Sequence, residues 1–349
     1  MHSPPGNRPK CLCQHPHNSA PSRIRLHSIV KSMSEYAAVL QEAGAPAWSG
    51  RPGKLPAPGE PLTEAIARKV DLELTRMQET LGWHADSNMF LTVRTWAHTA
   101  LQRIGALSAL GLIQPAGTAG LHGRGARPLR LGVFPIAANP LHWAHLMSGL
   151  AAMERFCLDK ILFVIAGSDP RKPDLASAIL RHLVAQQVLR LFHPLFEYSP
   201  IALGSSLPGE VNIFRIMSSH GAQPLHAFYL AGSDHCHRFA PQSGHPDTIQ
   251  RLEEGVRKAI HGFDPRTRWL SVVFLDRGDC SESVGSFLDV RWIEQMPLKT
   301  SSTRIRGALS GREPLCELAA LPFTAYCLLC TQGTYQMQQE KVGGLAEES

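Results

Sequence analysis

Residues 129–145 have the sequence LRLGVFPIAANPLHWAH, in which a short apolar run is followed by a loop and two histidines. The apolar run Leu129 to Phe134 predicts a buried β-strand. Residues 141–156 predict a helix that begins directly after the loop. A strand, a short loop and a helix in this order are typical of one repeating unit of an α/β fold.

The same alternation continues toward the C-terminus. Further strands are predicted over 160–166, 225–231 and 269–275, with helices over 176–192 and 246–260. Short apolar runs separated by helices indicate a parallel sheet covered on both faces. The predicted fold class is therefore α/β, a Rossmann-like doubly wound sheet. Because such folds bind ligands at the carboxyl ends of their strands, the residues just after each strand are the candidate site.

The rest of the chain divides by composition. Residues 1–61 are rich in Pro, Gly and Ser and predict a disordered tail. Residues 62–128 form a small helical segment, with helices over 62–81 and about 90–112, and a Gly-rich linker. The α/β domain is expected over 129–335 and a flexible tail over 336–349. The acid-free first 34 residues are similar to a transit peptide, but their prolines favour a disordered tail or a start at Met33.

Bulk composition limits the class of protein. Hydrophobic residues make up 44% of the 349 residues, which is enough to form a core, and no apolar run reaches the roughly 18 residues of a membrane span. The net charge of +6 suits an anionic ligand without requiring nucleic acid. Cys11 and Cys13 lack a second ligand cluster, and Cys327 and Cys330 predict buried thiols, so neither a metal site nor a disulfide framework is expected. A cytoplasmic location is expected, with mitochondrial import as the alternative, and a homo-oligomer is left open.

His142 and His145 stand three apart at the predicted start of a helix, so they share a face. The N-terminus of a helix attracts phosphate through its free N–H groups and its dipole. Two imidazoles there can stabilise charge on a phosphoryl group during transfer. Spacing alone also allows two surface histidines, in a chain that contains 17, or a metal site without a neighbouring carboxylate.

Residues 299–306 have the sequence KTSSTRIR, in which Ser301, Ser302 and Thr303 open a predicted helix and two arginines follow. Hydroxyl side chains cap the free N–H groups of a helix start. Together with the forked donors of arginine they can also hold a polyphosphate. By itself the segment fits an ordinary helix cap with exposed arginines equally well.

Taken together, the two segments resemble the nucleotidyltransferase superfamily with HxGH and ISSTxIR signatures, and within it the nicotinate/nicotinamide mononucleotide adenylyltransferases. The family's opening IGLFGGTFNPIHxGH aligns with residues 131–145 without a gap. Its GxPPHK segment matches Gly167 to Lys172, its GAD matches Gly232 to Asp234, and its RxG matches the region of Arg277 and Gly278. The resemblance spans about 129–335.

This resemblance implies adenylyl transfer from ATP to nicotinate or nicotinamide mononucleotide, with release of pyrophosphate and formation of a pyridine dinucleotide, a step of NAD biosynthesis. Mg²⁺ is expected to bind mainly through the ATP phosphates, without protein ligands. The implied partners are ATP and a mononucleotide, with no nucleic acid and no membrane. The implied site residues are His142 and His145 for catalysis, Lys172, Ser302, Thr303 and Arg306 for the phosphates, and Asn139, Gly232 and Asp234 for the nucleotide.

The chain departs from the family at the first loop, where the family's Gly-Gly-Thr-Phe is replaced by residues 135–138, PIAA. Pro135 removes a backbone donor and fixes φ, and Ile136 adds a branched side chain next to the expected acceptor pocket. The central glycine of HxGH is Ala144, and the histidine of PPHK is Arg171. Two alternatives therefore remain: a related nucleotidyltransferase with another phosphorylated acceptor, and a non-catalytic nucleotide-binding homologue.

Overall fold

The computed structural model describes residues 61–115, 127–167, 174–220, 224–237, 248–276, 285–294, 296, 298 and 300–331. All of them belong to one compact unit, Trp48–Ser349. The predicted tails and most of the Gly-rich linker lie outside the described residues, as do Cys11 and Cys13. Within the described residues no helix is long and apolar enough to cross a membrane.

Six parallel strands form one sheet in the order β3-β2-β1-β4-β5-β6. Their bounds are β1 Leu129–Ile136, β2 Lys160–Ile165, β3 Phe196–Ser199, β4 Leu225–Gly232, β5 Arg268–Leu275 and β6 Asp289–Ile293. The chain moves outward from β1 to β3 and then returns to the other side of β1 as β4. This reversal is the switch point at which doubly wound folds bind ligands, and it confirms the predicted fold class.

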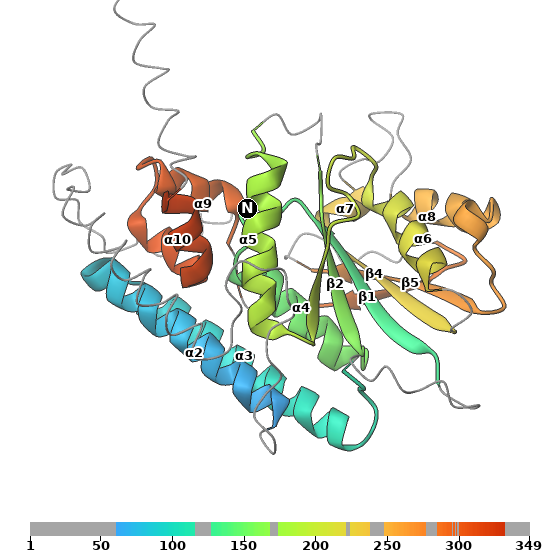
Figure 1. Cartoon of the computed structure of the whole chain (residues 1–349), viewed down its shortest axis with the longest axis horizontal. Coiled ribbons are helices and arrows are strands. Elements are labelled where there is room, and N and C mark those ends of the chain that lie inside the picture. The colour runs from blue at the N-terminus through green and yellow to red at the C-terminus, as the bar shows by residue number, and fades with distance from the viewer. Residues whose placement is uncertain are drawn as a thin grey trace, which may run out of the picture. The chain divides into compact units, whose positions relative to one another are not determined.

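Helices cover both faces of the sheet (Figure 1). Trp143–Arg155 (α4) and Ala178–Leu189 (α5) lie on one face, and Gly209–Ser219 (α6) and Thr248–Arg257 (α8) on the other. Further α-helices are α7 Asp234–His237, α9 Ser302–Leu309 and α10 Phe323–Thr331. Short 3₁₀ segments are η1 Gly82–His84, η2 Arg190–Phe192, η4 Ile260–Gly262 and η5 Leu315–Ala320.

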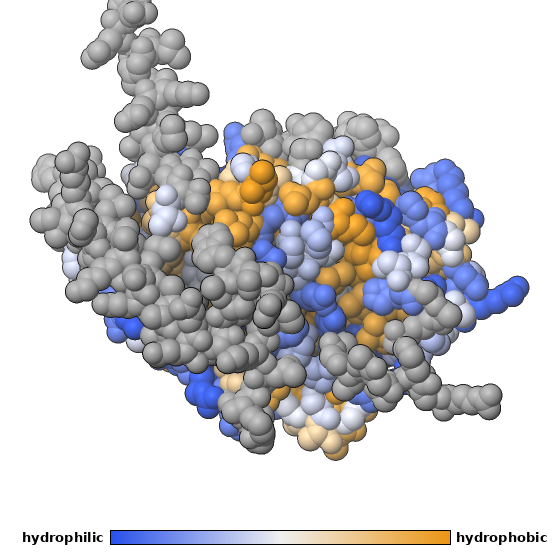
Figure 2. Space-filling view, in the orientation of Figure 1, coloured by the Kyte–Doolittle hydropathy of each residue, from blue (hydrophilic) through white to orange (hydrophobic). Residues whose placement is uncertain are grey.

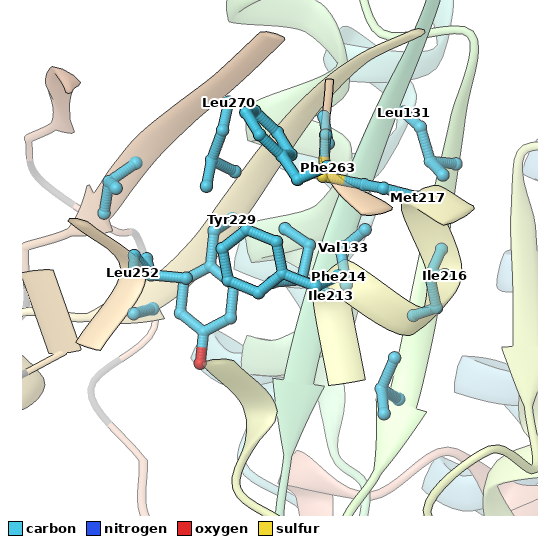
Figure 3. Packing of buried hydrophobic residues seen from close by; sticks show 14 of the residues in the cluster. Leu131, Val133, Ile213, Phe214, Ile216, Met217, Tyr229, Leu252, Phe263 and Leu270 are labelled. Atoms are coloured by element: carbon cyan, nitrogen blue, oxygen red, sulfur yellow. The ribbon is translucent and has the colours of Figure 1, made fainter. Parts of the chain in front are cut away.

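The core between the sheet and α6 and α8 is built from alternate strand residues, because successive side chains of a strand point to opposite faces (Figure 3). Val133 of β1 and Tyr229 of β4 point toward this layer. Phe214 of α6 meets Phe263 edge to face, with ring centroids 5.7 Å apart. On the face shown in the space-filling view, hydrophobic residues (orange) lie among hydrophilic ones (blue) (Figure 2).

Two helices precede the sheet: Leu62–Leu81 (α2) and Ser87–Ala109 (α3), joined through η1. The buried residues of α2 recur at helical spacing, and α3 packs on α4 while α2 packs on α10. Glu73 of α2 is fully buried, and its carboxylate accepts hydrogen bonds from Thr324 N and Oγ1, each at 2.8 Å. The helical segment thus contacts the α/β part within one compact unit; its status as a separate domain stays a prediction.

Strand β1 is longer than predicted, because it continues through Pro135 and Ile136. Both residues pair with β2, opposite Val164 and Ile165, whereas pairing with β4 ends at Val133. A proline has no N–H to donate, so it is tolerated where one side of a strand has stopped pairing. The expectation that these two residues form a loop was therefore wrong. Strands β3 and β6 and helix α6 were not anticipated.

Candidate phosphate-binding site

His142 and His145 form one cluster at the start of α4. His142 is the N-cap residue, with extended backbone (φ −143°, ψ 171°), and it is buried. Its backbone N–H donates to Nδ1 of His145 at 3.4 Å, and the two ring centroids lie 3.9 Å apart. Because Nδ1 of His145 accepts a hydrogen bond, the proton of its neutral ring lies on Nε2. The two imidazoles therefore lie together at the start of α4, the end of a helix whose dipole attracts anions.

The loop 137–140 joins β1 to α4 and is held on the side of α5. Asn139 is 3% exposed, and both ends of its amide are engaged. Its Nδ2 donates to the carbonyl of Asp174 at 3.1 Å, and its Oδ1 accepts from the N–H of Ala176 at 3.1 Å. Asn139 thereby ties the loop after β1 to the segment that leads into α5. Its predicted contact with a nucleotide stays a prediction.

Arg181 of α5 also holds the loop after β1, and the sequence did not identify it as a site residue. Its Nη1 donates to the carbonyls of Ala137 and Ala166, each at 2.7 Å, and its Nη2 donates to the carbonyl of Gly167. Its Nε donates to the carbonyl of Ala176 at 2.9 Å. The sequence signal for this role is an arginine within the apolar stretch AILRHLVAQQVL. An arginine is rarely buried unless its charge is paired or hydrogen-bonded.

Helix α9 also holds the loop after β1. Ser301 caps the helix by accepting from Arg304 N at 3.3 Å. Ser302 Oγ donates to the carbonyl of Pro140 at 3.3 Å, and Arg306 Nη1 donates to the carbonyl of Asn139 at 2.8 Å. The bonded residues are 162 and 167 positions apart in the sequence. Contact between the two predicted motifs is therefore direct.

Thr303 also belongs to this assembly, since its Oγ1 accepts from Arg306 Nη2 at 3.4 Å. Gly232 ends β4, the strand next to β1, opposite Leu275 of β5. It thus lies at the same carboxyl edge of the sheet as the β1 loop. Asp234 opens the short helix α7, but its side chain is outside the described part of the chain.

Several predicted landmarks cannot be placed. Lys172, Arg171, Arg277 and Gly278 lie outside the described residues. Among the residues that are described, no group of three or more His, Cys, Asp or Glu side chains could hold a metal ion. The donors found around the loop are imidazoles, hydroxyls, a guanidinium and helix N–H groups, which is a set suited to anions.

Pro135 is accommodated by a glycine at the start of α6. A Cβ atom placed on Gly209 would lie 2.7 Å from both Pro135 Cβ and the Tyr229 hydroxyl, so a larger residue does not fit there. Ile136 is buried. Burial, and next the charge of Glu210, raise the pKa of Tyr229, which keeps its phenol neutral. Pro135 is thus packed into the layer between β1 and α6.

One titratable side chain lies next to Arg181 on α5. Burial, followed by the charge of Arg181, lowers the pKa of His182. The Nδ1 atom of His182 lies 2.7 Å from the Tyr198 hydroxyl. His182 is therefore neutral at physiological pH and adds no charge to the site.

Comparison with known proteins gives no match to a family model. Curated proteins do match. A probable nicotinate-nucleotide adenylyltransferase of Thermoanaerobacter sp. is 35% identical over 78 residues, which are 22% of this chain and 37% of the relative. One of Thermus thermophilus is 39% identical over 54 residues, 16% of this chain and 29% of the relative. One of Desulfitobacterium hafniense is 23% identical over 215 residues, 61% of this chain and 98% of the relative.

The chain is a sequence relative of the nicotinate-nucleotide adenylyltransferases. This confirms the resemblance drawn from the motifs. The chain spans only about a third of the length of the first two adenylyltransferase relatives. A solved structure, Plasmodium falciparum nicotinic acid mononucleotide adenylyltransferase complexed with NaAD, is 13% identical, with a TM-score of 0.42, covering 59% of this chain and 96% of that one.

Proposed function

We propose that this protein transfers the adenylyl group of ATP to nicotinate or nicotinamide mononucleotide, releasing pyrophosphate and forming a pyridine dinucleotide. One observation carries the proposal most directly. Ser302 and Arg306 of α9 bond to the carbonyls of Pro140 and Asn139, directly before the histidine pair. These bonds support the proposal that the two predicted phosphate motifs, distant in sequence, act as a single anion site at the carboxyl edge of the sheet. The names of the sequence relatives support the choice of substrates.

In the proposed reaction a phosphate oxygen of the mononucleotide attacks the α-phosphorus of ATP. A new O–P bond forms, the bond to the bridging oxygen of the β-phosphate breaks, and pyrophosphate leaves with that electron pair. The substrate supplies the nucleophile, so the protein's contribution is alignment and charge stabilisation. We propose that His142 and His145, with the helix start of α4, stabilise the charge on the reacting phosphate oxygens.

The start of α9 would hold the rest of the triphosphate. Arg306 uses Nη1 and Nη2 on Asn139 and Thr303, and a guanidinium carries five N–H donors in total. Donors thus remain for phosphate oxygens while the loop stays attached. Thr303 and Ser302 add hydroxyls, and Lys172 would add a positive charge. Gly232, Asp234 and Asn139 are proposed to shape the nucleotide end of the site.

We propose that Mg²⁺ arrives with ATP as part of the substrate. Three protein ligands are not grouped anywhere in the described part of the chain. A magnesium ion that keeps its waters and binds phosphate oxygens needs no protein cage, and it would neutralise the leaving pyrophosphate.

The test is direct: full-length protein is incubated with ATP, Mg²⁺ and each mononucleotide, and dinucleotide is measured by chromatography. Dinucleotide from at least one acceptor is expected. His142→Ala should lower turnover about 100-fold or more, because it removes a donor to the transition state. His220→Ala is the matched control, since the ring of His220 contacts the carbonyl of Ile216 within α6. It should leave turnover unchanged.

Other outcomes would contradict the proposal. Pyrophosphate release with a different phosphorylated acceptor, and none with either mononucleotide, would identify a related transferase. Calorimetric binding of ATP without turnover on any acceptor would identify a nucleotide-binding homologue that has lost catalysis. Equal turnover of His142→Ala and the unsubstituted protein would remove the histidine pair from the mechanism.

A further inference from the structure

Four carbonyl groups around the β1 loop converge on one side chain, Arg181. Two belong to the loops that follow β1 and β2, at Ala137 and Ala166, and a third belongs to Gly167. The fourth, of Ala176, belongs to the segment that enters α5. Loop carbonyls have no ladder partner of their own, so each one buried without a donor would cost about 1–3 kcal/mol. Arg181 supplies these donors from a single rigid group.

The chemistry of the position requires arginine. A guanidinium presents five N–H donors in a planar fork, and Arg181 uses Nε, Nη1 and Nη2 together. A lysine ammonium has three donors at one point and cannot reach carbonyls on three different segments. All three nitrogens of the Arg181 guanidinium are engaged by backbone carbonyls of this chain. Any effect on a reaction must pass through the backbone that it holds.

That backbone leads directly to the phosphate site. Ala137 opens the loop whose next residues, Asn139 and Pro140, receive Arg306 and Ser302 of α9. Asn139 is fastened to the α5 entry as well, through Asp174 and Ala176. The loop is thus hydrogen-bonded to both α5 and α9. His142, the N-cap residue of α4, follows the loop directly.

We propose that Arg181 is a positioning residue that fixes the β1 loop, and through it the histidine pair, relative to α9. The kinetic consequence rests on the proposed adenylyl transfer, whereas the structural consequence does not. A displacement of about 1 Å at reacting groups can cost about 100-fold in rate. Loss of the Arg181 hydrogen bonds therefore lowers kcat while the KM for ATP changes little, because the effect falls on alignment in the transition state.

The experiment uses full-length Arg181→Ala and Arg181→Lys, with Arg190→Ala as the matched control. Arg190 follows the same helix, and its Nη1 donates to Gln187 Oε1, three residues earlier, at 3.2 Å. Turnover is measured well below each variant's melting temperature. Arg181→Ala should lower kcat about 100-fold with little change in KM. Millimolar guanidinium chloride should restore activity at least about tenfold by refilling the donor site, and equal sodium chloride should not. Arg190→Ala should match the unsubstituted protein.

Amide hydrogen exchange gives a second measurement that needs no turnover. The N–H of Ala166 donates to the carbonyl of Ile136 at 2.9 Å, and the N–H of Ala176 donates to Asn139 Oδ1. Both amides, with those of residues 141–146, should exchange faster in Arg181→Ala, while the amides of β5 keep their protection. Should Arg181→Ala fail to fold, Arg181→Lys should show the same pattern to a smaller degree.

Several results would overturn the proposal. One is an unchanged kcat in folded Arg181→Ala. Another is a loss of activity that guanidinium does not restore, together with faster amide exchange across the whole sheet. That combination would mean that the substitution destabilises the whole fold. If the unsubstituted protein makes no dinucleotide, the proposed function fails, and exchange alone decides the role of Arg181. Local loss of protection then supports the positioning role of Arg181, and its absence refutes it.

Discussion

Replacing Glu73 by glutamine should change how the stability of this protein depends on pH. Glu73 is fully buried between α2 and α10, where its carboxylate accepts hydrogen bonds from Thr324 N and Oγ1 at 2.8 Å. Burial raises the pKa of Glu73 from its usual 4.5 to about 7, although the hydrogen bonds from Thr324 act against the shift. Glutamine has the same shape, still accepts from the Thr324 N–H and does not titrate.

The direction of the pKa shift of Glu73 determines whether stability rises or falls with pH. Because the pKa of Glu73 is raised on folding, the folded state binds the proton more tightly than the unfolded state. The stabilisation is complete below about pH 4.5 and is lost as the pH rises to about 7. A shift from 4.5 to about 7, at 1.36 kcal/mol per unit, corresponds to about 3 kcal/mol.

The assay is urea unfolding of both proteins between pH 4.5 and 8. The quantity compared is the difference in unfolding free energy, since other titrating groups cancel in that difference. Glu73→Gln should gain up to about 3 kcal/mol relative to the unsubstituted protein as the pH rises through this range. Glu79→Gln is the control: Glu79 is an exposed residue of the same helix, and its curve should stay within about 0.5 kcal/mol. Parallel curves for Glu73→Gln and the unsubstituted protein would refute the reasoning.

Three further predictions concern the site and its support. In Gly167→Ala, the added Cβ would lie 2.1 Å from the carbonyl oxygen of Ser205, so the melting temperature should fall, and an unchanged temperature would contradict the close approach. Asp159→Asn removes the buried carboxylate that Arg127 contacts, and chemical denaturation should show a loss of about 2–3 kcal/mol; a loss under about 0.5 kcal/mol would contradict this. Arg306→Lys cannot make two forked hydrogen bonds, so kcat/KM for ATP should fall about tenfold or more in steady-state kinetics, whereas an unchanged value would contradict a role in phosphate binding.

Much of the α/β core was predictable, because each element leaves a local pattern. Strands β2, β4 and β5 and helix α2 were found within a residue or two, from apolar runs and helical spacing. Strand β3 was missed because it is four residues long, and β6 because its sequence DVRWI carries charges typical of an exposed edge. The end of β1 was misplaced because proline normally marks a loop, whereas here the strand still pairs with β2 on one side.

The sequence by itself determined the fold class and the chemical character of the site, because strand and helix periodicity and the two phosphate motifs are properties of neighbouring residues. Only the tertiary structure decided how the motifs meet: Arg306 on the carbonyl of Asn139, Arg181 across two loops, and Glu73 on the first turn of α10. These contacts join residues between 14 and 251 positions apart. No local pattern encodes such pairings, because they arise only when the sheet closes and brings the carboxyl ends of distant strands to one edge.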